Sequence, residues 1–429
     1  MKPTKLYWIL FFVTNAAIAY ITPLMFSFPA AMFPVFYFLL RGLLLMTALL
    51  LLLLLLDTHI VKNKSISKFR SGFAAVLFVS ISLFYLFEFF FTFYPETNGL
   101  NDTYCSQTWR YYYWRLNKQG FRDIDFQSME GNGKLAIALA GDSYTEGHGI
   151  RRNEDRVSDR IRKSLPNYNV YNIGKCGYDI FDEAKLIRTI PIIPEVLVLQ
   201  ICANDWDYLS EPQQPEMPAG TESSWSDMLL LYPAKYSVTL NYLKSKLTNL
   251  LARIDEGKIR KQDKQKIYKA FDVKPPKKEQ NSQEEIFRYS IDHSALPDDS
   301  IQLRLFKLFR PYQPSLSVMM DTLRFNDYLS ELDSLNAYCK SRYIHLLIVP
   351  YPEFDEFSMS VSAKYINRYI CREISRRGLE CMDIYPALQR AHLKTYTANS
   401  CDNHINAEAS KYVADTLLGY LQLKGLVGK

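Results

Sequence analysis

The stretch LAIALAGDSYTEGHGI, residues 135–150, ends an apolar run with a tight polar turn that carries Ser143. A serine hydroxyl is a poor nucleophile at neutral pH unless a neighbouring imidazole takes its proton, and that imidazole needs a carboxylate to fix its tautomer. Near the other end of the chain, residues 402–406 read DNHIN and carry an aspartate and a histidine two residues apart. Covalent acyl chemistry therefore depends on whether the fold brings these two segments together.

Alternating strand and helix patterns surround both segments. Nearly continuous apolar runs predict buried strands, and apolar residues at spacings of three and four predict amphipathic helices. The predicted strands cover 135–140, 168–174, 195–201, 343–352 and 379–384, and the predicted helices cover 157–165, 180–190, 318–341, 362–377 and 409–421. Because strands that are apolar throughout are covered on both faces, as in parallel sheets, the alternation predicts a doubly wound α/β fold.

Polar segments follow the predicted strands at the edge where open α/β sheets bind ligands, outside the carboxyl ends of the strands. GDS at 141–143 follows the first strand, NIGKCGY at 172–178 the second, and CAND at 202–205 the third. The loop 402–406 precedes the last helix and could place its histidine at the same edge. We therefore expect these four segments to converge on one site.

The four segments resemble the motif blocks of the GDSL or SGNH hydrolase superfamily: GDS, then NxGxxGY, then a strand ending in ND, then DxHxN before the last helix. The resemblance covers roughly residues 135–205 and 343–421. It implies a flavodoxin-like, three-layer α/β/α sandwich with a parallel sheet, and serine chemistry without a cofactor or a metal. Two residues depart from the family pattern, Cys202 in place of a glycine and Ile405 in place of a proline, and many members space the acid three residues before the histidine.

The resemblance also implies a role for individual residues. Ser143 would be the nucleophile, His404 the general base, and Asp402 the carboxylate behind the histidine. The backbone amides of Ser143 and Gly177, with the side-chain amide of Asn204, would form the oxyanion hole that stabilises a tetrahedral intermediate. Alternatively, Gly177 could be an ordinary turn glycine, and Asn204 could be a turn or helix-capping residue.

Four further residues near these segments are candidates for contact with the substrate: Asp142, Tyr144, His148 and Asp205. Among the remaining histidines, His148 is the rival to the one at 404, because it follows the serine by five residues. We expect it to line the pocket or to lie at the surface. Asp205 has helix capping as an alternative, since aspartate favours that position.

The first hundred residues predict a membrane anchor. Three apolar segments, at about 6–28, 33–56 and 72–94, are each long enough to cross a bilayer. Lysines precede the first segment and basic residues fill the loop 57–71, which places both in the cytoplasm. We therefore expect a multi-pass cell-membrane protein with three transmembrane helices, whose carboxyl-terminal domain is extracytoplasmic, either periplasmic or at the cell surface.

The expected organisation is a membrane anchor over 1–96, a juxtamembrane connector over 97–134, and a hydrolase domain over 135–429. A large insertion at about 206–317 interrupts the domain, and its basic run at 256–280 could bind an acidic glycan or lipid headgroup, or form a solvated helix face.

The charge and cysteine content restrict the partners. The net charge of +6 gives no case for nucleic-acid binding. Seven cysteines could pair in an oxidising compartment, but the odd number leaves at least one free, and no spacing among them resembles a zinc site.

An outward-facing serine acyl hydrolase would meet acylated surface polymers. Family analogy favours removal or transfer of small acyl groups, such as acetyl, on cell-envelope carbohydrate. No motif decides whether water or a sugar hydroxyl attacks the acyl-enzyme, and a transferase would need a separate membrane partner to deliver acyl groups. Two alternatives stay open: a lipase-like or thioesterase enzyme, and a non-catalytic protein whose hydrolase fold binds glycans.

Overall fold

The computed structural model describes residues 76, 80, 83–84, 86–88, 90–99, 103–126, 129, 131–202, 205, 237–251, 269, 274, 300, 322–352, 354 and 361–428. The spans expected at 6–28 and 33–56, Asn204 and most of the insertion expected at 206–317 lie outside these residues. The chain divides into two compact units, Met1–Tyr112 with Ala219–Leu250, and Tyr113–Pro218 with Leu251–Lys429.

The second unit is built on a five-stranded sheet with the order β2-β1-β3-β4-β5, in which all neighbours are parallel. Its strands are β1 (Leu135–Ala140), β2 (Tyr168–Asn172), β3 (Val196–Ile201), β4 (His345–Pro350) and β5 (Glu380–Cys381). This is the flavodoxin-like order, whose switch point between β1 and β3 leaves a crevice outside the carboxyl ends of both strands. The predicted α/β class with a parallel sheet is confirmed.

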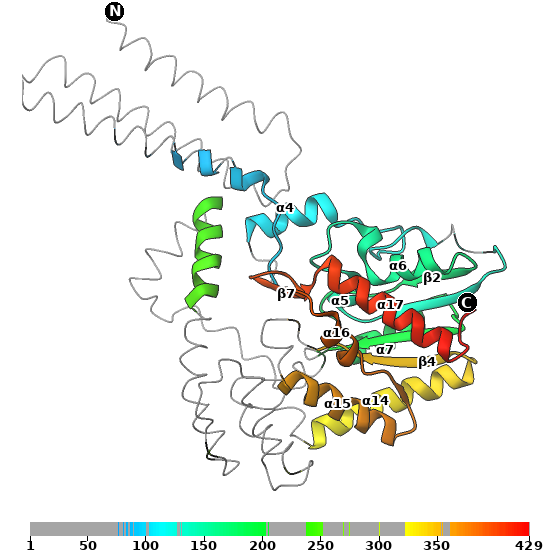
Figure 1. The fold of residues 1–429 in the computed structure, drawn as a ribbon. Helices are drawn as coiled ribbons and strands as arrows, with labels where there is room; N and C mark the ends of the chain where they lie inside the picture. Colours follow the sequence, from blue (N-terminus) through cyan, green and yellow to red (C-terminus); the bar gives the residue numbers. More distant parts are fainter. Residues whose placement is uncertain are drawn as a thin grey trace, which may run out of the picture. The chain divides into compact units, whose positions relative to one another are not determined.

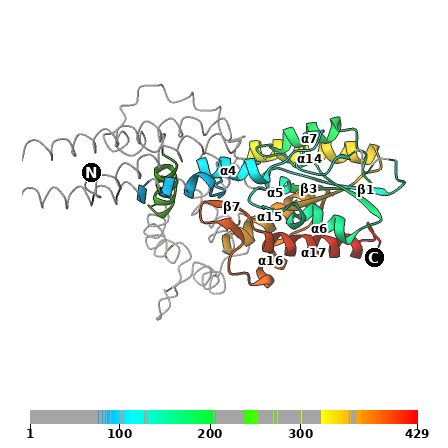
Figure 2. The same cartoon turned by 90° about the horizontal axis from the view of Figure 1, so that it is seen from above.

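Two layers of helices cover the sheet (Figure 1), and Figure 2 shows α7 and α14 on one side of the strands with α6 and α17 on the other. One layer contains α7 (Ile180–Thr189), α14 (Thr322–Ser341) and α15 (Val361–Arg376), and the other α6 (Val157–Ser164), α16 (Tyr385–Ala391) and α17 (Ala407–Leu423). Successive strand residues point to opposite faces, so Ala138 packs with the first layer and Ile137 with the second. The need to fill both layers explains why all six residues of β3 are buried.

The largest difference from the expected elements lies around the predicted histidine loop. Residues 402–405 form a short strand, β7 (Asp402–Ile405), which pairs antiparallel with β6 (Thr397–Asn399). These strands are polar and short, so they carry no alternating pattern that predicts a strand. At the sheet edge, β5 has two residues where the sequence predicts six, because only Glu380 and Cys381 find partners on β4.

Residues 113–126, expected as part of a connector, pack against the sheet of the second unit. Phe126 is buried and meets the ring of Tyr171 on β2 edge to face, with 5.1 Å between the ring centroids. The carboxylate of Asp123 accepts a hydrogen bond of 2.8 Å from the backbone N–H of Asn172. This segment therefore belongs to the same packed body as the strands.

In the first unit, a buried carboxylate lies within the third expected span, 72–94. Glu88 accepts hydrogen bonds of 3.0 Å from the backbone N–H groups of Val238 and Thr239 at the start of the helix 238–251. The first N–H groups of a helix have no partner within the helix, and a side-chain acceptor satisfies them. Among the helices that the structure describes, none combines the length and apolar character needed to span a membrane.

Candidate active site

The nucleophile candidate opens a one-turn helix directly after β1. Ser143 is the first residue of α5 (Ser143–Glu146), and Asp142 caps this helix by accepting a 3.0 Å hydrogen bond from the backbone N–H of Tyr144. Gly147 ends the helix in the left-handed conformation, with φ of 86°. The sharp turn holds the serine hydroxyl at the carboxyl end of β1, beside the switch point of the sheet.

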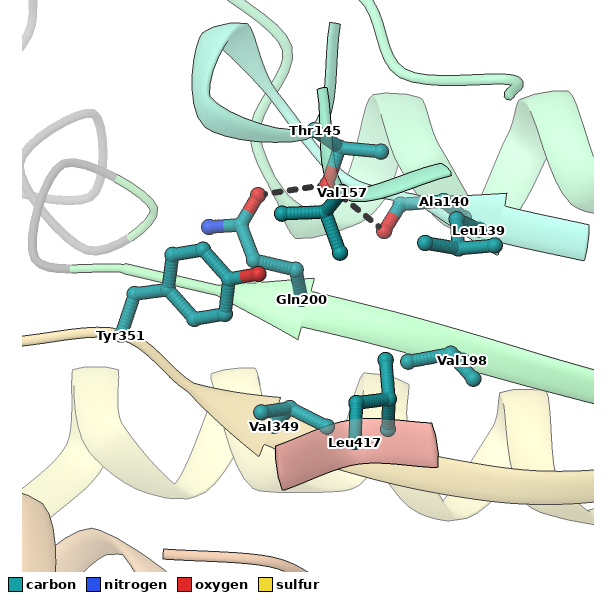
Figure 3. Close-up of a pocket in the computed structure, with 9 residues that line it drawn as sticks. All are labelled: Leu139, Ala140, Thr145, Val157, Val198, Gln200, Val349, Tyr351 and Leu417. Atoms are coloured by element: carbon teal, nitrogen blue, oxygen red, sulfur yellow. Dashed lines mark hydrogen bonds between the residues drawn. The ribbon is translucent and has the colours of Figure 1, made fainter. Parts of the chain in front are cut away.

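A small cavity lies beneath this turn (Figure 3). Thr145 Oγ1 lies 2.8 Å from Oε1 of Gln200, which projects from β3. Gly141 has φ of +150°, and a Cβ on it would come within 2.5 Å of the same Oε1, so the turn can pack on β3 only with glycine. The cavity is comparable to a single water molecule, so it supports the nucleophile turn and cannot hold a substrate.

Ser143, His404 and Asp402 form a continuous chain of hydrogen bonds. The serine Oγ lies 2.7 Å from Nε2 of His404, and Nδ1 of the same ring lies 2.6 Å from Oδ1 of Asp402. That Oδ1 also accepts a 3.1 Å hydrogen bond from the backbone N–H of His404. The two-residue spacing therefore suffices, because the acid binds both the backbone and the ring of the same histidine. This geometry lets the imidazole remove the proton of the serine hydroxyl.

The carboxylate of Asp402 is fully buried yet ionised. Burial by itself raises its pKa, but the neighbouring imidazoles of His148 and His404 outweigh this effect and hold the pKa of Asp402 well below its usual range. A permanent carboxylate at Nδ1 keeps the proton on that nitrogen and leaves Nε2 free to accept the serine proton.

His148 lies behind the hydrogen-bonded chain of Ser143, His404 and Asp402, and its side chain is buried. Its side chain is 1% exposed, and its Nε2 lies 3.5 Å from Oδ2 of Asp402. Its ring centroid lies 4.3 Å from that of His404 and 5.7 Å from that of Trp114. Two histidines thus share one carboxylate, and burial removes this one from contact with a ligand.

Tyr144 is half-buried and packs on the catalytic imidazole. Its ring centroid lies 4.8 Å from that of His404, and its hydroxyl donates a 3.4 Å hydrogen bond to the carbonyl of Asn403. The aromatic rings of Tyr351 and Phe354 lie on its other sides, at 6.1 and 5.7 Å. The tyrosine therefore restrains the ring of His404.

Asp142 and Asp205, two of the candidates for substrate contact, are both buried. Oδ2 of Asp142 accepts from the thiol of Cys202 at 3.2 Å and lies 3.3 Å from the hydroxyl of Ser143. Oδ2 of Asp205 accepts a 2.7 Å hydrogen bond from the backbone N–H of Cys202. This matches the capping role that the sequence left open for Asp205. Cys202 thus connects the loops after β1 and β3.

The loop after β2 carries Gly177, the expected oxyanion-hole glycine. Gly177 has φ of +78°, a backbone conformation that favours glycine. A Cβ on it would meet nothing within 4 Å, so lack of space is not the reason for glycine at this position. The backbone N–H of Cys176 donates a 2.5 Å hydrogen bond to Oε2 of Glu146 on α5. The loop is therefore fastened to the helix that carries Ser143, while Asn204 lies outside the described residues.

Two polar residues that fasten the site were not singled out from the sequence. Glu146 is buried; burial raises the pKa of its carboxyl, and the hydrogen bond from Cys176 opposes that rise. Asn172 donates from its side-chain nitrogen to the carbonyl of Thr145 at 2.7 Å and accepts from the N–H of Gly174 at 3.0 Å. Asn172 is the first residue of the NxGxxGY block, so the motif could have identified it as a site residue. Nothing in the sequence TEGHG distinguishes Glu146 from a surface acid.

Arg122, also not anticipated, holds the loop that carries His148. The arginine is fully buried and donates to the carbonyl of Gly147 and, at 2.6 Å, to the carbonyl of Ile150. Its guanidinium lies 4.8 Å from the ring centroid of Trp114. Burial, with a smaller contribution from a neighbouring arginine, lowers the pKa of Arg122 to about 9, so it stays charged at neutral pH.

Two clusters bring three potential metal ligands within 4.8 Å of one another: His148 with Asp402 and His404, and Asp142 with Cys202 and Asp205. In the first cluster both ring nitrogens of His404 are engaged in the catalytic chain. In the second, Cys202 already binds both carboxylates. Contacts among the residues of each cluster, including the backbone N–H of Cys202, explain both arrangements.

The comparison with solved structures returns proteins described as lipolytic proteins, lipases and acetyl xylan esterases. They include a lipolytic protein of the G-D-S-L family from Veillonella parvula, with 10% identity, coverage of 66% of this chain and 97% of that one, and a TM-score of 0.31. The acetyl xylan esterase AlAXEase has 12% identity, coverage of 67% of this chain and 100% of that one, and a TM-score of 0.32. The acetyl xylan esterase Est2A from Butyrivibrio proteoclasticus has 11% identity, coverage of 68% of this chain and 64% of that one, and a TM-score of 0.27. No protein-family model and no curated protein matches the chain. At these identities and TM-scores, the functional argument rests on the geometry of the site.

Proposed function

We propose that this chain is an SGNH-type serine hydrolase that cleaves acyl esters. The observation that carries the proposal is the chain of short hydrogen bonds from Ser143 through His404 to the ionised Asp402. In the first half-reaction Oγ of Ser143 attacks the ester carbonyl as His404 takes the hydroxyl proton. His404 then returns that proton to the departing alkoxide, and the acyl group stays on the serine. In the second half-reaction a water or another hydroxyl attacks the acyl-enzyme with His404 again as base.

The oxyanion that forms in each half-reaction requires fixed donors. We assign the backbone N–H groups of Ser143 and Gly177 and the side chain of Asn204 to this role. Support comes from the hydrogen bond between Cys176 and Glu146, which ties the loop of Gly177 to the helix of the nucleophile. Donors held in place before the reaction need no reorganisation as charge develops, and the loss of one commonly costs about 10²–10³ in rate.

We further propose that the site lies outside the cytoplasm and acts on acetylated carbohydrate of the cell envelope. The charge distribution around the apolar segments supports this orientation. Apolar side chains of the first unit also lie exposed on the helix that begins at residue 238, at Leu243, Leu247 and Leu250. Their spacing of three and four places them on one face, as expected of a helix that lies against lipid.

The test compares ester hydrolysis by the full-length chain in detergent with that of Ser143→Ala. We expect p-nitrophenyl acetate to be cleaved faster than butyrate or octanoate esters, and only by the chain with an intact serine. Activity that rises with acyl length would instead indicate a lipase-like or thioesterase enzyme. Equal turnover by the two proteins would overturn the enzymatic proposal and leave a glycan-binding protein.

Hydrolysis and transfer are separated by adding a sugar acceptor to the acetyl-ester assay. A transferase releases p-nitrophenol faster with the acceptor and forms an acetylated sugar, whereas a hydrolase releases free acetate at an unchanged rate. If transfer is observed, a membrane partner that supplies acyl groups is required. A reporter that is active only outside the cytoplasm, fused after Lys429, tests the orientation, and an inactive fusion would contradict it.

A further inference from the structure

Two cysteines of the second unit meet at the edge of the sheet. The Sγ atoms of Cys371 and Cys381 lie 2.6 Å apart. This is closer than nonbonded atoms pack, since even smaller carbon atoms rest at about 3.5–4.0 Å from one another. An S–S bond measures about 2.05 Å, so a small movement of either side chain brings the sulfurs to bonding distance. We propose that Cys371 and Cys381 form a disulfide in the native protein.

The local fold explains why these two side chains meet. Cys371 lies on α15 and Cys381 ends β5, and the chain between them reverses at Gly378, which has φ of +73°. The backbone N–H of Leu379 lies 3.4 Å from the carbonyl of Ile374, so the strand begins by folding back on the helix. Neither cysteine is fully buried. An oxidant therefore has access to the pair.

A disulfide at this position would stabilise the edge of the sheet. The edge strand β5 holds to β4 through only two residue pairs, Leu347 with Glu380 and Ile348 with Cys381. A covalent link from Cys381 to α15 would fasten this short strand to the helix that packs beside it. Closing a loop also restricts the unfolded chain, which raises stability.

The bond forms by thiol–disulfide exchange. One of the two cysteines, as a thiolate, attacks a protein disulfide or small-molecule disulfide and releases one thiol; the second cysteine then displaces the other thiol. The two cysteines together lose two electrons and two protons, and the oxidant is reduced to two thiols. Such oxidants persist outside the cytoplasm. The disulfide thus agrees with the proposed location but does not depend on the chemistry of Ser143.

The deciding experiment traps the cysteines in intact cells. Cells that make the full chain are treated with acid and then N-ethylmaleimide, and the protein is digested with trypsin under nonreducing conditions. Arginines separate the two cysteines, so they fall in different peptides, 369–372 and 378–390. We expect these peptides to be joined, and to separate on reduction. Recovery of both peptides with N-ethylmaleimide on their cysteines would overturn the proposal.

A stability measurement provides an independent readout on the purified full chain. Reductant should lower the melting temperature of the second unit by on the order of 5 °C. The double variant Cys371→Ser, Cys381→Ser should start near the lower value and show no response to reductant. Cys401→Ser, which leaves the pair intact, should respond as the unmodified chain does. A reductant response that persists in the double variant would contradict the assignment.

Discussion

Nε2 of His148 lies 3.5 Å from Oδ2 of Asp402, on the carboxylate oxygen that His404 does not bind. The catalytic acid is therefore held from both sides by imidazole rings whose centroids are 4.3 Å apart. One ring is hydrogen-bonded to Ser143, whereas the other is buried. The second histidine thus positions the acid.

Replacement of His148 should therefore impair turnover more than binding. In His148→Ala we expect kcat to fall by about tenfold with little change in KM, because a buried residue that acts through Asp402 does not touch the substrate. His148→Gln, whose amide can still donate to the carboxylate, should recover part of the loss. His392→Asn is a matched control at an exposed histidine, since asparagine tolerates the left-handed backbone found there. An altered KM at constant kcat would return His148 to a substrate-binding role.

Ser143→Ala should abolish ester hydrolysis, with a loss of at least about 10³-fold in kcat/KM, because it removes the hydroxyl that is hydrogen-bonded to the base. The exposed Ser164 provides a control, and Ser164→Ala should keep full activity. A fluorophosphonate probe offers a second measurement. It should label the unmodified chain and the control on the peptide that contains residue 143, and it should not label Ser143→Ala. Equal labelling of all three proteins would exclude Ser143 as the nucleophile.

The ionised state of Asp402 predicts how stability changes with pH. Because the pKa of Asp402 in the folded chain is lower than in the unfolded chain, its ionised form contributes stability above the unfolded value of about 3.9. That contribution is lost only as the pH falls below this value toward the lower folded pKa. The difference in unfolding free energy between the unmodified chain and Asp402→Asn should therefore hold from pH 8 to pH 5 and shrink below pH 4. A difference that disappears already near pH 6 would show that the carboxyl is not held in its ionised form.

Three glycines should respond differently to alanine. A Cβ on Gly174 would lie 2.5 Å from the backbone nitrogen of Glu146. Gly174→Ala should therefore separate the loop after β2 from α5 and destabilise the fold severely. Gly177→Ala meets no neighbour and should cost only about 1–2 kcal/mol for its positive φ. Gly419 has open space and an ordinary helical backbone in α17, so Gly419→Ala should raise stability by roughly 0.5–1 kcal/mol. Thermal unfolding of the three variants would test this order.

The hydrophobic pattern predicted the sheet well because each strand must fill two layers of core. The six residues of β3, five of them apolar, are all buried and report that requirement directly. The edge segments that carry Ser143 and Gly177 followed from the rule that loops after parallel strands converge. Strand β7 did not follow, since its existence depends on pairing with β6 and not on its own residues.

The buried polar network could not be predicted for a different reason. Arg122, Glu146 and His148 are all buried, although arginine and glutamate usually lie at the surface and histidine is intermediate. Their burial depends on partners distant in the sequence, such as the carbonyl of Ile150 for Arg122 and Asp402 for His148. No local spacing encodes such contacts.

The grip of Arg122 on the carbonyls of Gly147 and Ile150 sets a lower limit on the size of any catalytic fragment. A fragment trimmed to begin at β1 would keep the nucleophile, the base and the acid but would lose the clamp around the second histidine. Such a fragment would contain Ser143, His404 and Asp402 but would lack the hydrogen bonds that hold the loop of His148. The folded body that holds the candidate active site therefore begins at least thirteen residues before β1, in a segment that carries none of the four motif blocks.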